Sequence, residues 1–132
     1  MATIFTKIIN REIPCYKIAE DENYFAFLDI NPLKVGHTLV VPKKETDYLF
    51  DLHDDELTGL ILFSKKVAAA IKSVISCNRI GVAILGLEVP HVHLHLVPMD
   101  TMEDINFKKP KLKFSAEEFN EIASKISRKV IL

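Results

Sequence analysis

Apolar residues recur every three to four positions in two segments of the chain, which is the spacing of one face of an α-helix. These segments are residues 4–10 and residues 52–75, and the longer one begins with acidic residues, which the helix dipole favours. A third helix is expected over residues 116–125, because Ser115 and Glu118 have the spacing of a capping box. The pattern therefore predicts a short first helix, a long central helix and a final helix.

Shorter segments rich in β-branched or aromatic residues, bounded by turn residues, predict strands. They are residues 16–19, 24–29, 37–41, 79–85 and 91–97, and Pro42 and Pro98 are expected to end the third and the fifth. Strands that follow one another through short turns favour antiparallel pairing. We therefore expect an α+β fold, with a five-stranded antiparallel sheet and the long helix packed on one face.

Length and composition restrict the class of function. At roughly 150 residues per domain, 132 residues predict a single domain over 1–132. The 17 basic and 18 acidic residues give a net charge of -1, which argues against non-specific binding of nucleic acid. Two cysteines are too few for a disulfide scaffold, and no apolar run is long enough to cross a membrane. These features predict a cytoplasmic protein with reduced thiols, without a nucleic-acid or membrane partner.

Three histidines alternate with apolar residues at positions 91, 93 and 95. Alternate residues of a strand share one face, so the imidazoles would project together, about 6.6 Å apart. Val92, Leu94 and Leu96 would face the core instead. Packing does not explain the histidines, because strands favour β-branched and aromatic residues.

Three interpretations of this triplet compete. It could be a solvated polar face, although independent placement of three histidines in alternation is improbable. It could bind a metal, since two histidines at i and i+2 can share a zinc ion, with His37 or Glu88 as a third ligand. All three cannot ligate one ion from an extended strand, because they span about 13 Å. The third interpretation is nucleophilic catalysis by imidazole, with neighbouring histidines supplying charge and proton transfer.

The triplet and its flanking residues resemble the signature of the histidine triad (HIT) superfamily. The resemblance extends over most of the chain and includes four further blocks in the family's order: Ile4-Phe5-x-Lys7-Ile8-Ile9, Glu12-Ile13-Pro14, the segment 27–32 and the segment 36–43. It is strongest to the small histidine triad nucleotide-binding proteins, which include nucleoside phosphoramidases.

This resemblance implies a role for four histidines. His93 would be the nucleophile that attacks the α-phosphorus of a nucleotide and forms a covalent nucleotidyl-histidine, later hydrolysed by water. A nearby backbone carbonyl would fix its tautomer and leave one ring nitrogen free. His95 would contact the phosphate oxygens, and His91 and His37 would orient the site and ease proton movement.

The resemblance also implies a nucleoside pocket. Asp29 matches the position that binds the ribose hydroxyls, although an aspartate before Asn31-Pro32 also suits a turn. The positions that enclose the base are apolar, and residues of their type are most often plain core. They are Phe5, Ile8, Phe27 and Ile30.

The chain departs from the family directly before the triplet. Where relatives carry Gly-Gln-Ser or Gly-Gln-Thr, this sequence has Gly86-Leu87-Glu88, and the loop looks shortened. A carboxylate at position 88 would repel a phosphate unless it is protonated or turned away. Glu88 could alternatively bind a cationic leaving group or donate a proton.

The resemblance implies a homodimer joined through the fourth strand and the long helix, which would cover an exposed sheet edge. No cofactor or metal is expected, because Cys15 has no paired cysteine nearby. The expected function is a purine nucleotide hydrolase that cleaves nucleoside 5'-phosphoramidates or related α-phosphate linkages. The alternatives are a nucleotide-binding module with little turnover and a dinucleoside polyphosphate hydrolase. The sequence leaves the natural leaving group and the choice between adenine and guanine open.

Overall fold

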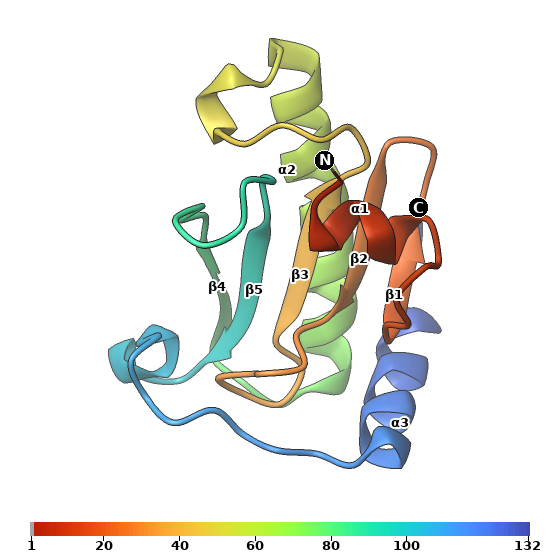
Figure 1. Cartoon of the computed structure of the whole chain (residues 1–132). Coiled ribbons are helices and arrows are strands. Elements are labelled where there is room, and N and C mark those ends of the chain that lie inside the picture. The colour runs from red at the N-terminus through yellow and green to blue at the C-terminus, as the bar shows by residue number, and fades with distance from the viewer. Residues whose placement is uncertain (1) are drawn as a thin grey trace.

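A computed structural model describes residues 2–132, and it contains every helix and strand expected from the sequence (Figure 1). The elements follow in the order α1 (Ile4–Ile9), β1 (Lys17–Glu20), β2 (Tyr24–Leu28), β3 (Thr38–Pro42), α2 (Asp54–Val74), β4 (Arg79–Ala83), β5 (Leu94–Met99) and α3 (Ala116–Ser127). Two short 3-10 helices, η1 (Leu49–Asp51) and η2 (Met102–Ile105), precede α2 and follow β5.

The five strands form one sheet in the order β1-β2-β3-β5-β4, and every neighbouring pair is antiparallel. The α+β fold with a five-stranded antiparallel sheet is therefore confirmed. All five residues of β2 and of β3 are buried, because both faces of the sheet are covered.

Helices cover the two faces unequally. The main core lies between the sheet and α2 and α3, and includes Ala26 and Val40 from the strands and Leu60 and Val67 from α2. A second, smaller cluster lies where α1 packs on the opposite face (Figure 1). Its buried members come from α1, β2 and β3, and are Phe5, Ile8, Phe25, Phe27, Leu39 and Val41.

The expected start of α3 is confirmed by its cap. The Ser115 hydroxyl accepts the Glu118 N–H at 3.1 Å, and the Glu118 carboxylate accepts the Ser115 N–H at 2.8 Å. These reciprocal bonds satisfy two donors that a helix N-terminus otherwise leaves free. None of the helices within residues 2–132 has both the length and the apolar character needed to cross a membrane.

The strand that carries the triplet begins and ends later than expected. Residues 91–93 precede β5, because the His91 N–H donates to the Val89 carbonyl and the Val92 N–H to the Thr46 carbonyl instead of to a strand. Pro98 does not end the strand but pairs with Ile80, beyond the last β3 pair of Thr38 with Leu96. β5 has a strand neighbour on one side only at that position, which accommodates a residue without a backbone N–H.

Candidate active site

His91 is fully buried and both its ring nitrogens are engaged. Nε2 lies 2.8 Å from the Pro42 carbonyl oxygen, and Nδ1 lies 2.7 Å from the Thr3 hydroxyl. A carbonyl can only accept, so Nε2 carries the proton and Nδ1 accepts the hydroxyl proton of Thr3. Burial lowers the pKa of His91 and thus favours this neutral form. The ring therefore has no free nitrogen for a metal or a substrate.

Thr3 connects His91 to Thr6 and Glu45, which the sequence analysis did not identify as part of the site. Its hydroxyl also accepts the Thr6 N–H at 3.1 Å and so caps α1, while its backbone N–H donates to Glu45 at 2.8 Å. The Thr6 hydroxyl donates to the same Glu45 oxygen at 2.7 Å. The backbone bond from Thr3 is the largest of the influences that lower the pKa of Glu45. Threonine before a predicted helix is an N-cap signal, but nothing local pointed to Glu45.

His93 has one ring nitrogen fixed and the other free. Nδ1 lies 2.8 Å from the carbonyl oxygen of His91, so Nδ1 carries the proton. In the neutral ring, Nε2 then keeps its lone pair. His93 also lines a pocket between the sheet and the loop 85–88, which is called the main pocket below. The ring of Phe5 packs against that of His93 with centroids 4.9 Å apart. This tautomer is the one that nucleophilic attack by imidazole needs.

His37 and His95 form a directional hydrogen-bond chain. The Leu33 N–H donates to His37 Nδ1 at 3.0 Å, so the proton of a neutral His37 is on Nε2. His37 Nε2 lies 2.9 Å from His95 Nδ1 and donates to it, which places the remaining proton of His95 on Nε2. Burial lowers the pKa of His37 to about 3 and that of His95 to about 4. Both rings are therefore neutral at pH 7, and His95 has an N–H free for a ligand.

Asp29 follows β2, and its two carboxylate oxygens have different environments. Oδ1 accepts the Asn31 N–H at 2.8 Å, which is the turn role expected before Asn31-Pro32. Oδ2 lies 3.6 Å from His37 Nε2, and the side chain lines the main pocket. Burial raises the pKa of Asp29, and the bond from Asn31 opposes that effect. One oxygen therefore serves the turn while the other is available to a ligand.

The main pocket has a volume of about 310 Å³. Its sheet wall consists of His93 and His95, His37 from the start of β3, and Asp29 and Asn31 from the end of β2. The opposite wall consists of the loop 85–88 before the triplet and of Phe107 and Lys111 from the segment after β5.

The structure brings five of the expected site residues together in this pocket: His37, His93, His95, Asp29 and Glu88. His91 lies behind it and holds His93 through its carbonyl. Phe5, Ile8 and Phe27 belong to the buried cluster beneath α1, where Phe5 contacts both His91 and His93. Ile30 is 63% exposed and does not line the pocket.

The loop 85–88 adopts a backbone that depends on one glycine. Gly86 has a φ of 74°, in the left-handed region that residues with a Cβ rarely adopt. Leu87 is 93% exposed. Glu88 is exposed and lines the pocket. The loop before the triplet therefore places a carboxylate at the pocket wall.

Phe107 and Lys111 were missed because their segment resembles a solvated basic connector in sequence. The Phe107 ring lies edge-on to His95, with ring centroids 4.8 Å apart, and its centroid is 6.3 Å from that of the His37 ring. The Leu112 N–H donates to the Pro32 carbonyl at 2.9 Å and holds the segment beside the pocket. Only contacts between residues far apart in the sequence identify the two residues as part of the site.

The hydrogen bonds suit neither a metal at Asp29, His37 and His95, which the structure brings together, nor one shared by His91 and His93. Asp29, His37 and His95 bring three potential ligand atoms within 4.8 Å of one another. For His37 to ligate through Nε2, its proton would have to be on Nδ1, where it would face the Leu33 N–H. His91 is committed at both nitrogens, so it cannot share an ion with His93. The donor set forms a proton-ordered chain instead.

Comparisons with known proteins agree with this geometry. The HIT domain model matches residues 10–102. An uncharacterized HIT-like protein of Borreliella burgdorferi is 39% identical, over 96% of this chain and 97% of that protein. An adenosine 5'-monophosphoramidase of Schizosaccharomyces pombe is 35% identical, over 98% of this chain and 99% of that enzyme. The crystal structure of a Hit-like protein from Bartonella henselae superposes with a TM-score of 0.83 at 32% identity, over 97% of this chain and 96% of that one.

The matched segment spans the sheet and all five expected residues that line the pocket: Asp29, His37, Glu88, His93 and His95. It also includes His91, which orders the ring of His93. By sequence, by fold and by the arrangement of its histidines, this chain belongs to the HIT domain family.

Proposed function

We propose that this protein hydrolyses purine nucleoside 5'-phosphoramidates, or related α-phosphate linkages, through a covalent nucleotidyl intermediate on His93. The observation that carries the proposal is the bond between His93 Nδ1 and the His91 carbonyl, which in the neutral ring leaves the lone pair on Nε2. His93 lines the pocket. The name of the Schizosaccharomyces pombe relative, adenosine 5'-monophosphoramidase, supports the same reaction class.

The reaction would take two steps. In the first, the Nε2 lone pair of His93 attacks the α-phosphorus, the phosphorus–nitrogen bond of the substrate breaks, and the leaving amine takes one proton from solvent. In the second, water attacks the same phosphorus and the histidine–phosphorus bond breaks. One water molecule is consumed in total: its oxygen ends on the released nucleotide, and its protons pass to that nucleotide or to solvent, which replaces the proton that the amine took.

The hydrogen-bond network would stabilise the charges that develop in these steps. Formation of the bond between Nε2 and phosphorus makes the imidazole of His93 cationic. The His91 carbonyl accepts the Nδ1–H of this ring at 2.8 Å and so stabilises the positive charge. The free Nε2–H of His95, ordered by His37, would donate to a phosphate oxygen. Because these dipoles are already oriented, no reorganisation is needed when charge forms.

The nucleoside would occupy the wall nearest β2 and α1. The free oxygen of Asp29 would accept hydrogen bonds from the ribose hydroxyls, as carboxylates do in dinucleotide folds. Phe5 and Phe27, whose ring centroids are 5.8 Å apart, would contact the base together with Ile8 and the exposed Ile30.

The test is incubation with adenosine 5'-phosphoramidate, comparing the wild type with His93→Ala. We expect AMP release by the wild type and a loss of at least about 10³-fold in the variant, because a nucleophile is removed. His53→Ala is the matched control, since His53 is exposed at the start of α2. Equal AMP release by wild type and His93→Ala would contradict the assigned nucleophile.

Binding and activity measurements distinguish this function from two alternatives. Leu87 and Glu88 replace family residues at the pocket wall and favour a nucleotide-binding module with little turnover. Calorimetric binding of AMP without measurable turnover would support that module. Faster hydrolysis of diadenosine polyphosphates than of phosphoramidates at matched concentration would support the dinucleoside polyphosphate hydrolase.

We also propose a homodimer across β4 and α2. β4 is the edge strand beside β5, and its Val82 is 56% exposed. An unpaired edge with exposed apolar residues is commonly covered by another chain. Light scattering should give twice the chain mass, and Val82→Lys should give one chain mass. A monomeric wild type at assay concentration would contradict this assembly.

A further inference from the structure

The main pocket contains an imbalance of charge. Asp29 and Glu88 contribute two carboxyl groups to its lining. His37 and His95 add no positive charge near pH 7, because burial lowers their pKa values to about 3 and about 4. Within the part of the chain that the structure describes, Lys111 is the only lysine or arginine that lines the pocket.

Lys111 lies on a segment that is fixed to the site. The segment leaves η2 and passes along the end of the sheet toward α3 (Figure 1). The Leu112 N–H donates to the Pro32 carbonyl at 2.9 Å, and Lys34 pairs with Asp104 of η2 at 3.6 Å. Phe107 packs on His95 with ring centroids 4.8 Å apart. The ammonium group is therefore carried by a segment tied to both the β2–β3 loop and the triad.

The ammonium group of Lys111 is itself anchored. It donates to the Phe107 carbonyl and, at 3.1 Å, to the Lys109 carbonyl. An ammonium has three donors, so one remains for a ligand. Burial is the largest influence on the pKa values of Asp29 and His37, and the charge of Lys111 is a further influence on both. Its charge therefore acts on the same part of the pocket as the ribose and phosphate positions proposed above.

We propose that Lys111 is the counter-charge for the phosphate group of nucleotides in this pocket, so that the segment 107–111 forms an anion subsite of the binding site. This inference rests on the proposed function and names the ligand class that Lys111 selects, a nucleoside carrying free phosphate oxygens. A phosphate near two carboxyl groups and neutral imidazoles would otherwise meet net negative charge. Lysine binds phosphate as a point charge, which suits a group that changes shape during the reaction.

A purely structural role for Lys111 makes a different prediction. Its two bonds to backbone carbonyls could simply hold the turn 107–111, and Phe107 with it. Loss of such a support would weaken every ligand alike. A ligand with a phosphate and the same ligand without one therefore separate the two roles, because only the first senses a lost counter-charge.

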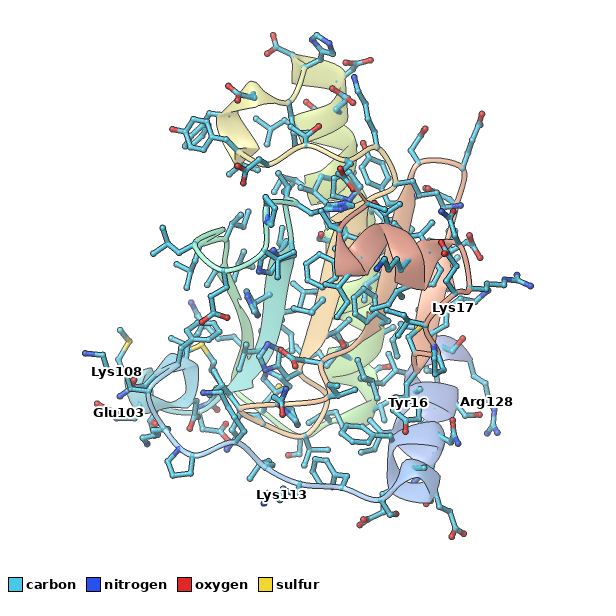
Figure 2. All side chains as sticks on the ribbon, viewed as in Figure 1. Tyr16, Lys17, Glu103, Lys108, Lys113 and Arg128 are labelled. Carbon is cyan, nitrogen blue, oxygen red and sulfur yellow. The ribbon has the colours of Figure 1, made fainter. Side chains whose placement is uncertain are left out.

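Lys113 provides a matched control on the same segment. It is exposed, does not line the pocket, and lies at the outer edge of the molecule (Figure 2). Lys111→Met and Lys113→Met remove the same charge from the chain. Lys111→Arg retains the charge at the site and tests whether a cation is sufficient.

The experiment is calorimetric titration of the wild type and these three variants with AMP and with adenosine. We expect Lys111→Met to weaken AMP binding by about 10- to 100-fold, as for a lost hydrogen bond to a charged group, and to leave adenosine binding unchanged. Lys111→Arg should recover most of the AMP affinity, and Lys113→Met should match the wild type.

Two outcomes would overturn the anion subsite while leaving the proposed function intact. The first is a wild type that binds AMP and a Lys111→Met variant that binds it equally well. The second is a variant that loses AMP and adenosine affinity by the same factor, which would assign Lys111 a structural role. A wild type that binds neither AMP nor adenosine would overturn the subsite and the proposed function together.

Discussion

His93 Nδ1 lies 2.8 Å from the carbonyl oxygen of His91, so the first histidine of the triplet sets the tautomer of the second. His91 can hold that position because its own ring is fixed by the Thr3 hydroxyl on one side and the Pro42 carbonyl on the other. The free lone pair on His93 therefore depends on residues that lie outside the pocket.

Thr3→Val tests this dependence, because valine keeps the shape of threonine and removes the hydroxyl. His91 Nδ1 would lose its 2.7 Å partner while buried, and α1 would lose its cap. We expect the free energy of unfolding to fall by about 1 to 3 kcal/mol in urea denaturation. The rate of phosphoramidate hydrolysis should fall with it, since His91 then holds His93 less firmly.

Thr58→Val is the control for the Thr3 variant. The Thr58 hydroxyl is exposed and donates to the Asp54 carbonyl within α2, so its removal leaves no buried group unpaired. A change of less than about 0.5 kcal/mol is expected there. Equal changes in the free energy of unfolding would show that the bond between Thr3 and His91 contributes no more to stability than the exposed bond of Thr58.

The two neutral histidines His37 and His95 predict a loss of stability in mild acid. Their pKa values are about 3 and about 4 in the folded protein, against an ordinary value of 6.5. At pH values between the folded and the ordinary pKa values, the unfolded chain binds protons that the folded protein does not. The free energy of unfolding therefore decreases as the pH falls below about 6.5. Between pH 7.5 and 5 the pair should account for about 2 to 4 kcal/mol.

Urea denaturation across that range checks the acid effect. The raised pKa of Asp29 acts in the opposite sense, because a folded state that holds a proton more tightly gains stability as the pH falls. An unfolding free energy that stays flat from pH 7.5 to 5 would contradict neutral rings at positions 37 and 95.

Helices and strands could be predicted from the sequence because their signals are local. The aromatic-rich run over residues 24–29 marked β2, and Ser115 with Glu118 marked the start of α3. The start of β5 could not be predicted in this way. The Val92 N–H bonds to Thr46 in a distant loop, and no alternation within the triplet reveals that partner.

The candidate site was predictable only in part, for the same physical reason. Asp29, His37, His93 and His95 belong to or adjoin strands, so pairing brings them together once the sheet order is known. Lys111 reaches the pocket through a bond between Leu112 and Pro32. Its local sequence, rich in lysine and containing Pro110, is equally typical of a solvated loop.

Asp29→Asn tests the proposed ribose contact. The free carboxylate oxygen would accept hydrogen bonds from two ribose hydroxyls. An asparagine amide would accept fewer, because one of its two terminal groups is a donor NH2. We expect the wild type to bind AMP more tightly than 2',3'-dideoxy-AMP by about 10-fold, and the variant to bind the two nearly alike. Calorimetry with both nucleotides measures the difference, and an unchanged preference in the variant would assign Asp29 to the Asn31 turn alone.

Gly59→Ala should destabilise the protein, although the same change in an exposed helix usually stabilises it. A Cβ at position 59 would collide with the hydroxyl of Tyr24, which donates to the Glu56 carbonyl at 2.8 Å. Urea denaturation should show a loss of about 1 to 3 kcal/mol. Tyr24→Phe removes the hydroxyl, so adding it to Gly59→Ala should cost less than the two single changes summed; strict additivity would contradict the collision.

Glu88→Gln tests the effect of a carboxylate at the pocket wall. Glu88 lines the pocket but is exposed, so solvent screens its repulsion of a bound phosphate. Removing the charge should therefore strengthen AMP binding by only about 2- to 5-fold, and raising the salt concentration should reduce that gain. Glu103→Gln, on an exposed residue at the periphery (Figure 2), should leave AMP affinity unchanged. If Glu88→Gln instead weakens AMP binding, the carboxylate must contact the ligand as an acceptor, and the repulsion assigned to it is wrong.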